Sequence, residues 1–107
     1  MSYPGIEELN LLHANICQAL GDPKRIQILY ALHNQPRHVT ALAEELGMPQ
    51  PTASRHLRVL RERALVTTER DGAAVVYYLA DDRMIAVLDV MRQVMRSALA
   101  RQADILS

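Results

Sequence analysis

The sequence predicts a mainly helical domain with one small β-hairpin, an α+β fold whose elements follow the order ααααββα. Three observations indicate it. Apolar residues recur at helical spacing along most of the chain. Two runs rich in β-branched and aromatic residues flank Asp71-Gly72, which is a strong hairpin signal. The chain has 107 residues, the length of one domain, so residues 1–107 are expected to form a single unit.

The first predicted helix spans about residues 6–20 and ends before Gly21. Asp22 and Pro23 predict the start of the second helix, about residues 23–33, because the carboxylate can cap free backbone amides and proline suits the first helical position. The residues expected on the buried face of this helix are Ile26, Leu29, Tyr30 and Leu32.

A short third helix and a longer fourth one are predicted to meet at a glycine corner. Thr40 is expected to cap the third helix, residues 41–46, and Gly47 to end it in the left-handed conformation. The fourth helix begins near Pro49 to Pro51 and runs to about residue 63. Ala43 lets a crossing helix approach closely, and this pattern is typical of a helix-turn-helix. The expected buried stripe of the fourth helix is Ala53, Leu57 and Leu60.

The hairpin follows the fourth helix directly, in the position of a two-stranded wing. Asp81 and Asp82 then open a last helix over about residues 83–106, with more apolar positions than a small domain can cover. Such a helix predicts a dimer interface, formed together with the first helix, about residues 6–20.

Composition excludes several classes of protein. No apolar run approaches a membrane span, and the N-terminus lacks the pattern of a secretory signal, so we expect a cytoplasmic protein without membrane association. The single cysteine, Cys17, cannot form an internal disulfide. There is no phosphate loop, no nucleophile paired with a base and no paired carboxylates in a plausible cleft, so we expect no enzyme.

Net charge is zero, but the basic residues are unevenly distributed. Between Gln50 and Arg70 five arginines face two glutamates, whereas acidic residues gather elsewhere. A local cationic face on a neutral protein suits a regulator that binds one DNA site without coating every duplex.

The segment from Leu42 to Leu60, followed by Leu65-Val66, Asp71-Gly72 and residues 75–79, resembles the ArsR/SmtB family of bacterial winged-helix repressors. Residues 19–29 match the family's approach to its second helix. The resemblance covers residues 16–80 well and the flanking helices by position only. It implies a winged helix-turn-helix of five helices, and a homodimer that binds a near-palindromic DNA operator and leaves it when an inducer binds.

By this resemblance the fourth helix reads DNA. Its start offers groups for base contact, because glutamine can pair with adenine and arginine with guanine. Arg58 is expected on phosphate, His56 as a partly buried hydrogen-bonding residue at the boundary between helix and duplex, and Arg70 at the wing. The alternative is a merely solvated surface helix, which is the favoured interpretation for Arg61 and Arg63. The DNA-binding candidates are Gln50, Thr52, Ser54, Arg55, His56, Arg58 and Arg70.

One departure from the family pattern lies at the start of the reading helix. Pro49 and Pro51 replace the family's usual serines, so two hydroxyls that could cap the helix or bond phosphate are absent. Proline fixes the local geometry instead. The family's phosphate contact at this helix start therefore cannot be carried over.

The family's metal sites cannot be carried over either, so no metal or cofactor is expected and the inducer stays unknown. Thr40 and Leu42 stand where arsenite and soft-metal sensors have cysteines. At the last helix Asp81 is retained, but the other three positions of the family's zinc site are Arg83, Val94 and Ser97.

His13 and Cys17 remain, four residues apart on the first helix. They are either part of a metal or thiol sensor or a rim histidine beside a buried cysteine. The alternative function is a winged-helix module that binds protein without DNA.

Overall fold

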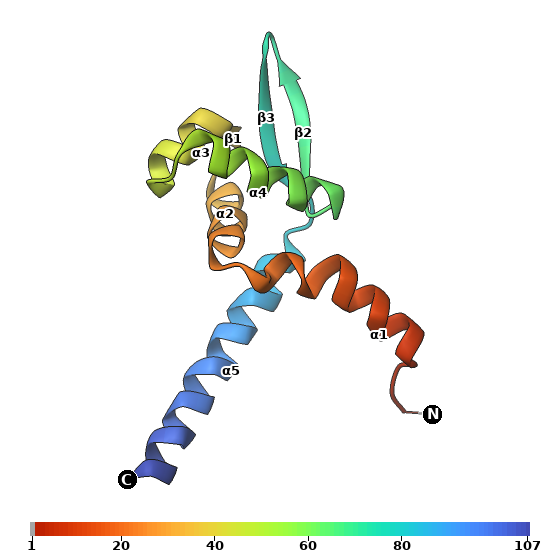
Figure 1. Cartoon of the computed structure of the whole chain (residues 1–107), viewed down its shortest axis with the longest axis vertical. Helices are drawn as coiled ribbons and strands as arrows, with labels where there is room; N and C mark the ends of the chain where they lie inside the picture. Colours follow the sequence, from red (N-terminus) through yellow and green to blue (C-terminus); the bar gives the residue numbers. More distant parts are fainter. Residues whose placement is uncertain (1) are drawn as a thin grey trace.

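The computed structural model describes residues 2–107 and confirms the predicted fold, with five α-helices and a hairpin in the expected order (Figure 1). The first helical segment is α1 (Ile6–Leu12), which continues into a π-helical turn η1 (His13–Cys17) and a 3-10 turn η2 (Ala19–Gly21). The other elements are α2 (Pro23–Asn34), β1 (Arg37–His38), α3 (Val39–Leu46), α4 (Gln50–Glu62), β2 (Val66–Asp71), β3 (Ala74–Leu79) and α5 (Arg83–Leu106).

Both ends of α2 are capped by side chains. Asp22 Oδ1 accepts a hydrogen bond from the Lys24 amide at 2.8 Å, and Pro23 occupies the first helical position, as predicted. At the other end Arg37 Nη2 donates to the Ala31 carbonyl at 3.1 Å. Arg37 also forms an ion pair with Glu45 of α3, so it joins the two helices.

The corner between α3 and α4 has the predicted glycine geometry. Gly47 has φ 65° and ψ 36°, and the Met48 amide donates to the Ala43 carbonyl at 3.0 Å. The prediction that Thr40 caps α3 is wrong, because the helix begins earlier, after His38, without a side-chain cap. Because α3 starts at Val39, Thr40 lies within its first turn, beyond the cap position, and its hydroxyl donates to Gln50 Oε1 at 3.4 Å.

The sheet has three strands in the order β1-β3-β2, so the predicted two-stranded hairpin gains a partner. Arg37 pairs with Tyr77 and His38 with Val76, all antiparallel. Within the hairpin, Asp71 still pairs with Ala74, which makes Gly72-Ala73 the connecting residues. The turn therefore lies one residue later than predicted, and Gly72 supplies its positive φ of 64°.

The core lies where α2, α3, α4, the base of the hairpin and the start of α5 meet. Ala53, Leu57 and Leu60 are buried as predicted, and so is Leu29. Ile26 and Tyr30 are only partly buried and pack against the edge of the core, whereas Ile28, which the sequence pattern did not include, is fully buried. The largest fully buried side chains are Ile28, Leu29, Leu32, Leu42, Leu57, Leu60 and Val66.

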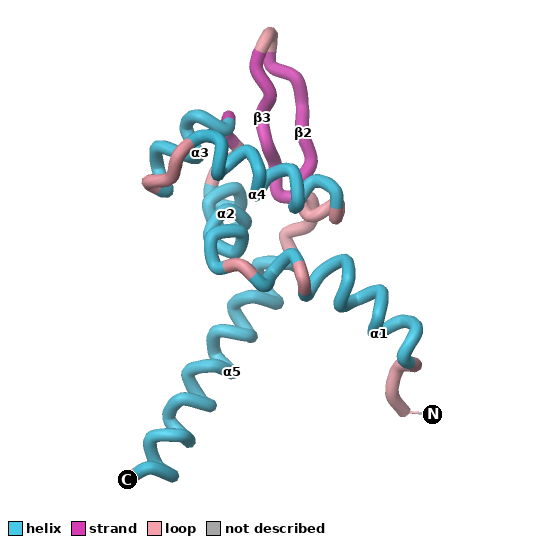
Figure 2. Tube along the Cα trace, in the orientation of Figure 1, coloured by secondary structure: helices cyan, strands magenta, loops and turns pink. Residues whose placement is uncertain are grey.

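The first and last helices extend away from this core in different directions (Figures 1 and 2). None of the residues of α1 is buried, and in α5 only Ile85 and Leu88 are. The Cα radius of gyration is 16.5 Å, whereas a compact chain of this length would have about 13 Å. Within residues 2–107, no helix is long and apolar enough to cross a membrane.

A polar cluster fixes the direction of α5 relative to α2. Tyr30 Oη donates to Asp89 Oδ1 at 2.6 Å, and Asp89 also pairs with Arg92 at 3.2 Å. The Arg92 guanidinium lies 5.5 Å from the centre of the Tyr30 ring. The carboxylate of Asp89 has a lowered pKa because it accepts the Tyr30 hydrogen bond.

Candidate nucleic-acid interface

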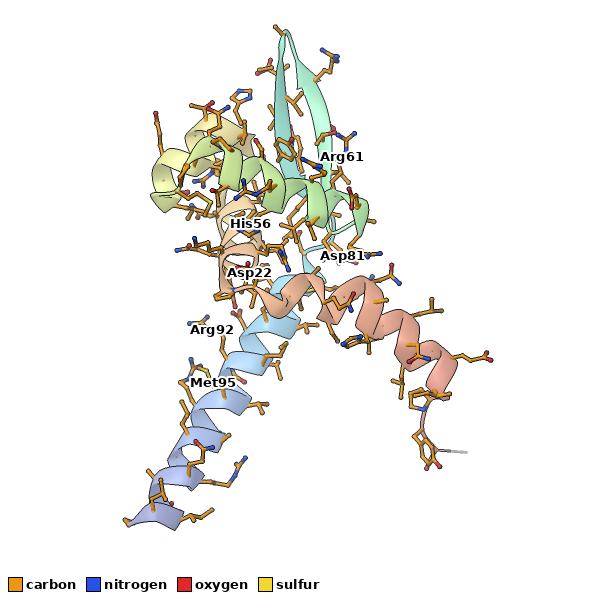
Figure 3. All side chains as sticks on the ribbon, viewed as in Figure 1. Asp22, His56, Arg61, Asp81, Arg92 and Met95 are labelled. Carbon is orange, nitrogen blue, oxygen red and sulfur yellow. The ribbon has the colours of Figure 1, made fainter. Side chains whose placement is uncertain are left out.

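Helix α4 lies at the surface beside the hairpin, with one side in the core and the other in solvent (Figures 1 and 3). Ala53, Leu57 and Leu60 are 0% exposed, which directs that stripe inward. Helical geometry then directs Arg55 and Arg58 outward, and both are exposed. These two arginines make no ion pair within the part of the chain that the structure describes. Their charge is available to an anionic partner.

The first turn of α4 combines proline with two exposed polar side chains. Gln50 and Ser54 are both exposed and lie one turn apart on the helix. Gln50 Oε1 accepts a hydrogen bond from Thr40 Oγ1 of α3 at 3.4 Å, which leaves its amide group as a donor. Pro49 precedes the helix and gives it no side-chain cap.

Within α4, Thr52 forms a hydrogen bond with Arg55, one of the two outward arginines. Arg55 Nη2 donates to Thr52 Oγ1 at 3.4 Å, and Thr52 is itself half-buried. Arg55 and Arg58 line a shallow hollow of about 260 Å³ with Val59 and Glu62. The predicted candidates Thr52, Arg55 and Arg58 therefore lie together on the outward part of the helix.

His56 points toward the protein instead of outward. The ring is half-buried and lies above the start of α2, near Asp22 and Arg25 (Figure 3). Burial lowers the pKa of His56, although the carboxylate of Asp22 acts in the opposite direction. At neutral pH the ring is uncharged, so it contributes no positive charge to the outward face of α4.

The wing projects beyond α4, with Arg70 exposed one residue from the end of β2. The next residue, Asp71, faces β1, and its Oδ2 lies 3.7 Å from Nε2 of His38. Figure 3 places Arg61 on the side of α4 next to the hairpin. Figure 1 shows the hairpin, which carries Arg70 near its tip, projecting past α4.

Arg25 is a structural residue that sequence reasoning did not single out. Its Nε donates to the Ala19 carbonyl at 2.6 Å, and Nη2 donates to the Gln18 carbonyl at 3.2 Å. These are carbonyls at the end of the first helical segment, where a nearby cation is favoured. An arginine just after the predicted helix end at Gly21 is the signal that could have found it.

The first helix shows no metal site in this chain alone. Cys17 is exposed, so the interpretation as a buried cysteine is wrong. His13 and Cys17 lie at the two ends of the π-helical turn η1. Among residues 2–107 no group of three or more His, Cys, Asp or Glu side chains could hold a metal ion.

Comparison with known proteins identifies the family. The model for "Bacterial regulatory protein, arsR family" matches residues 22–68. The HTH-type transcriptional regulator Rv0081 of Mycobacterium tuberculosis is 33% identical over 101 residues, which cover 94% of this chain and 89% of that protein. The chain belongs to the ArsR family. This result confirms the resemblance that the motifs indicated.

Further ArsR-family relatives agree. NmtR of M. tuberculosis is 46% identical over 76 residues, or 71% of this chain; the match spans 63% of NmtR. The crystal structure of Rv0081 superposes with a TM-score of 0.77 at 32% identity, over 89% of this chain and 96% of that one. The solution structure of Mb0332 from Mycobacterium bovis, a homodimeric winged helix-turn-helix DNA-binding domain, gives 0.75 at 29% identity, over 94% and 95%. NmtR and Rv0081 are named as HTH-type transcriptional regulators, and Mb0332 as a possible ArsR-family transcriptional regulator, in agreement with the expectation that the chain is not an enzyme.

The ArsR-family match runs from the cap of α2 into β2 and includes the corner between α3 and α4. Helices α1 and α5 lie outside it. The matched part is therefore the part that carries the candidate DNA contacts on α4.

Proposed function

We propose that this ArsR-family protein is a transcriptional repressor that binds a near-palindromic DNA operator as a homodimer, with α4 of each protomer in the major groove. The observation that carries the proposal is the pair of exposed, unpaired guanidinium groups of Arg55 and Arg58, which within residues 2–107 have no carboxylate partner and lie on the face of α4 opposite the core. A helix with such a face beside a wing fits a major groove lined by phosphates.

The residues divide into reading and anchoring groups. Gln50, Ser54 and Arg55 are assigned to base edges or their neighbourhood, with Thr52 orienting Arg55 through its hydroxyl. Arg58 lies a turn further along and is assigned to phosphate. On the hairpin, Arg70 is assigned to the adjacent backbone or minor groove. His56, half-buried over α2, is assigned to packing at the edge of the duplex.

The helix start provides little for phosphate. The Thr52 amide already donates to the Pro49 carbonyl at 3.0 Å, and Pro51 has no amide hydrogen. Only the Gln50 amide is left of the groups that usually bind an anion at a helix N-terminus. The side chains of α4 must therefore supply most of the binding energy in this proposal.

Dimerisation is assigned to α1 and α5. The α5 stripe, which we define as Val87, Met91, Val94 and Ala98, recurs at helical spacing, and its first three members are about half exposed. The extended shape of the single chain and the homodimeric state of Mb0332 support a second copy on this surface.

The two α4 helices of such a dimer would lie one DNA turn apart, ~34–36 Å. An inducer acting at α1 or α5 would release DNA by changing that spacing.

The proposal is tested by selecting bound duplexes from a random pool and measuring their affinity by fluorescence anisotropy between about 50 and about 200 mM salt. We expect a two-fold symmetric consensus and an affinity that falls steeply with salt. The double variant Arg55→Glu/Arg58→Glu should lose binding, whereas Arg96→Glu, an exposed arginine on the side of α5 opposite the α5 stripe, should not. Regulation in vivo that survives the double variant would favour the protein-interaction module instead.

A further inference from the structure

A hydrogen bond between two side chains crosses the corner of the helix-turn-helix. Thr40, in the first turn of α3, donates from its hydroxyl to Oε1 of Gln50, the first residue of α4, at 3.4 Å. Both side chains are exposed, and α3 packs beside α4 (Figure 1). The bond therefore joins a residue of the supporting helix to a residue assigned to DNA reading.

The backbone on both sides of this bond is held by the fold. Gly47 ends α3 in the left-handed conformation, with φ 65°, so that the chain turns directly into α4. Ala43 of α3 is 4% exposed and Ala53 of α4 is 0% exposed, and such small buried side chains let the two helices approach closely. The position of Thr40 relative to the start of α4 is thus fixed, and the freedom that remains at Gln50 lies in its side chain.

The bond gives the amide group of Gln50 a defined orientation. An exposed glutamine can present either end of its amide to a partner, because several bonds of its side chain rotate. Here Oε1 points toward Thr40 of α3, so Nε2 points away from it. Oε1 keeps a second lone pair to accept another hydrogen bond, and Nε2 has hydrogens to donate. An acceptor and a donor side by side match the N6 amino group and the N7 acceptor of adenine in the major groove.

We infer that Thr40 is a positioning residue for DNA reading, which holds the amide of Gln50 in the orientation that pairs with adenine. Thr40 acts through Gln50 and needs no base contact of its own. The inference rests on the proposed function and adds to it the base that Gln50 reads and the residue that sets this preference. Without the hydroxyl, the amide of Gln50 would have to be ordered when DNA binds, and this loss of entropy would weaken the preference for adenine.

The test compares two variants of the full chain on DNA. Thr40→Val removes the hydroxyl and keeps the shape of the side chain, whereas Thr40→Ser keeps the hydroxyl. Fluorescence anisotropy measures binding to a selected duplex, to duplexes changed at single base pairs and to random DNA. In each half-site we expect one adenine whose replacement weakens binding of the original chain about tenfold. Thr40→Val should reduce this preference about fivefold, as expected for one neutral hydrogen bond, and Thr40→Ser should retain it.

Two further measurements connect the effect to Gln50. In Gln50→Ala the preference for adenine should disappear at the same base pair, and adding Thr40→Val should then change nothing further, because the residue through which Thr40 acts is gone. In the protein without DNA, NMR relaxation should show the side-chain amide of Gln50 more ordered in the original chain and in Thr40→Ser than in Thr40→Val.

An undiminished preference for adenine in Thr40→Val would overturn the inference. A preference for cytosine at the Gln50 position would also overturn it, because cytosine offers only a donor there and would require the amide to be turned round. Equal weakening on all duplexes in Thr40→Val would assign Thr40 to phosphate instead. If the original chain bound no duplex selectively, the proposed function itself would fail, whereas selective binding that Thr40→Val leaves unchanged would refute the role of Thr40 alone.

Discussion

At the scale of single residues, Ala64 shows how α4 is ended. Among residues 2–107 it is the only residue other than glycine with a positive φ, at the position where glycine is usual. Left-handed backbone costs an L-residue roughly 1–2 kcal/mol, and glycine avoids this cost but loses more entropy on folding. The cost of the left-handed backbone and the extra entropy that glycine loses oppose each other, and the cost of the left-handed backbone is larger.

We therefore expect Ala64→Gly to raise the free energy of unfolding by about 0.5–1 kcal/mol, measured by urea denaturation. Ala100→Gly, in the exposed part of α5, is the matched control and should lower it by about 0.5–1 kcal/mol. Destabilisation by Ala64→Gly would show that the observed conformation carries no strain.

His56 predicts a pH dependence of stability. Its pKa lies below the ordinary value of 6.5, chiefly because the ring is buried. As the pH falls through 6.5, the unfolded chain takes up a proton that the folded chain does not, so the free energy of unfolding decreases until the folded pKa is reached. Thermal melts between about pH 7 and about pH 5 should show this loss.

In His56→Gln the decrease over the same pH range should be smaller than in the original chain. His13→Gln, which alters an exposed ring, serves as the comparison. An identical pH profile for His56→Gln and the original chain would contradict a half-buried His56 that is neutral at pH 7.

Several residues could be assigned from sequence because their reasons are local. Asp22 caps the helix that follows it, Gly47 takes the left-handed conformation, and Leu57 falls on the inner stripe of its helix. Arg25 could not be assigned in this way, because its partners are carbonyls made available only when the preceding helical segment ends.

At the scale of elements, α4 and the hairpin were predictable and β1 was not. Helix α4 has a regular apolar spacing, and the hairpin has a turn that contains Gly72. Strand β1 has only two residues, too few for an alternating pattern, and forms by pairing with Val76 and Tyr77, which lie far along the chain. The π-helical turn η1 likewise leaves no recognisable spacing. It is recognised in the structure by its backbone bonding, in which the Gln18 amide donates to the His13 carbonyl five residues earlier, at 2.9 Å.

The phosphate contact proposed for Arg58 of α4 predicts a specific change in the salt dependence of DNA binding. Arg58→Gln should weaken binding to selected and random duplexes alike, because a phosphate contact carries no sequence information. The slope of log affinity against log salt should become shallower by about 0.9, since the variant neutralises one phosphate fewer. Anisotropy titrations at several salt concentrations measure both effects. Weakening confined to the selected duplex would assign Arg58 to a base instead.

At the scale of the whole molecule, the shape of the chain needs a partner. The terminal helices account for nearly all of the exposed large hydrophobic side chains, and α5 leaves the core after Leu88. A monomer with a radius of gyration of 16.5 Å exposes apolar surface that a second copy would cover. The sequence predicts this arrangement because the apolar spacing continues far beyond the length that one core can use.

Val94→Glu should convert the protein to a monomer, because it places a carboxylate in the middle of the α5 stripe. Gln93→Glu introduces the same charge on the neighbouring residue, away from the stripe, and should leave the dimer intact. Sedimentation velocity distinguishes the two states. A dimer that persists in Val94→Glu would place the interface elsewhere on the molecule.

In the proposed function, Arg55, on the outward face of α4, is the residue on which DNA reading by this helix chiefly depends. Its role is tested most directly by comparing Arg55→Gln with the original chain on a selected duplex and on duplexes changed at single base pairs. We predict that binding to the selected duplex weakens by about 1–3 kcal/mol and that discrimination disappears at one position in each half-site, with binding to random DNA little changed. An unaltered base preference in Arg55→Gln would contradict the assignment of α4 as the reading helix.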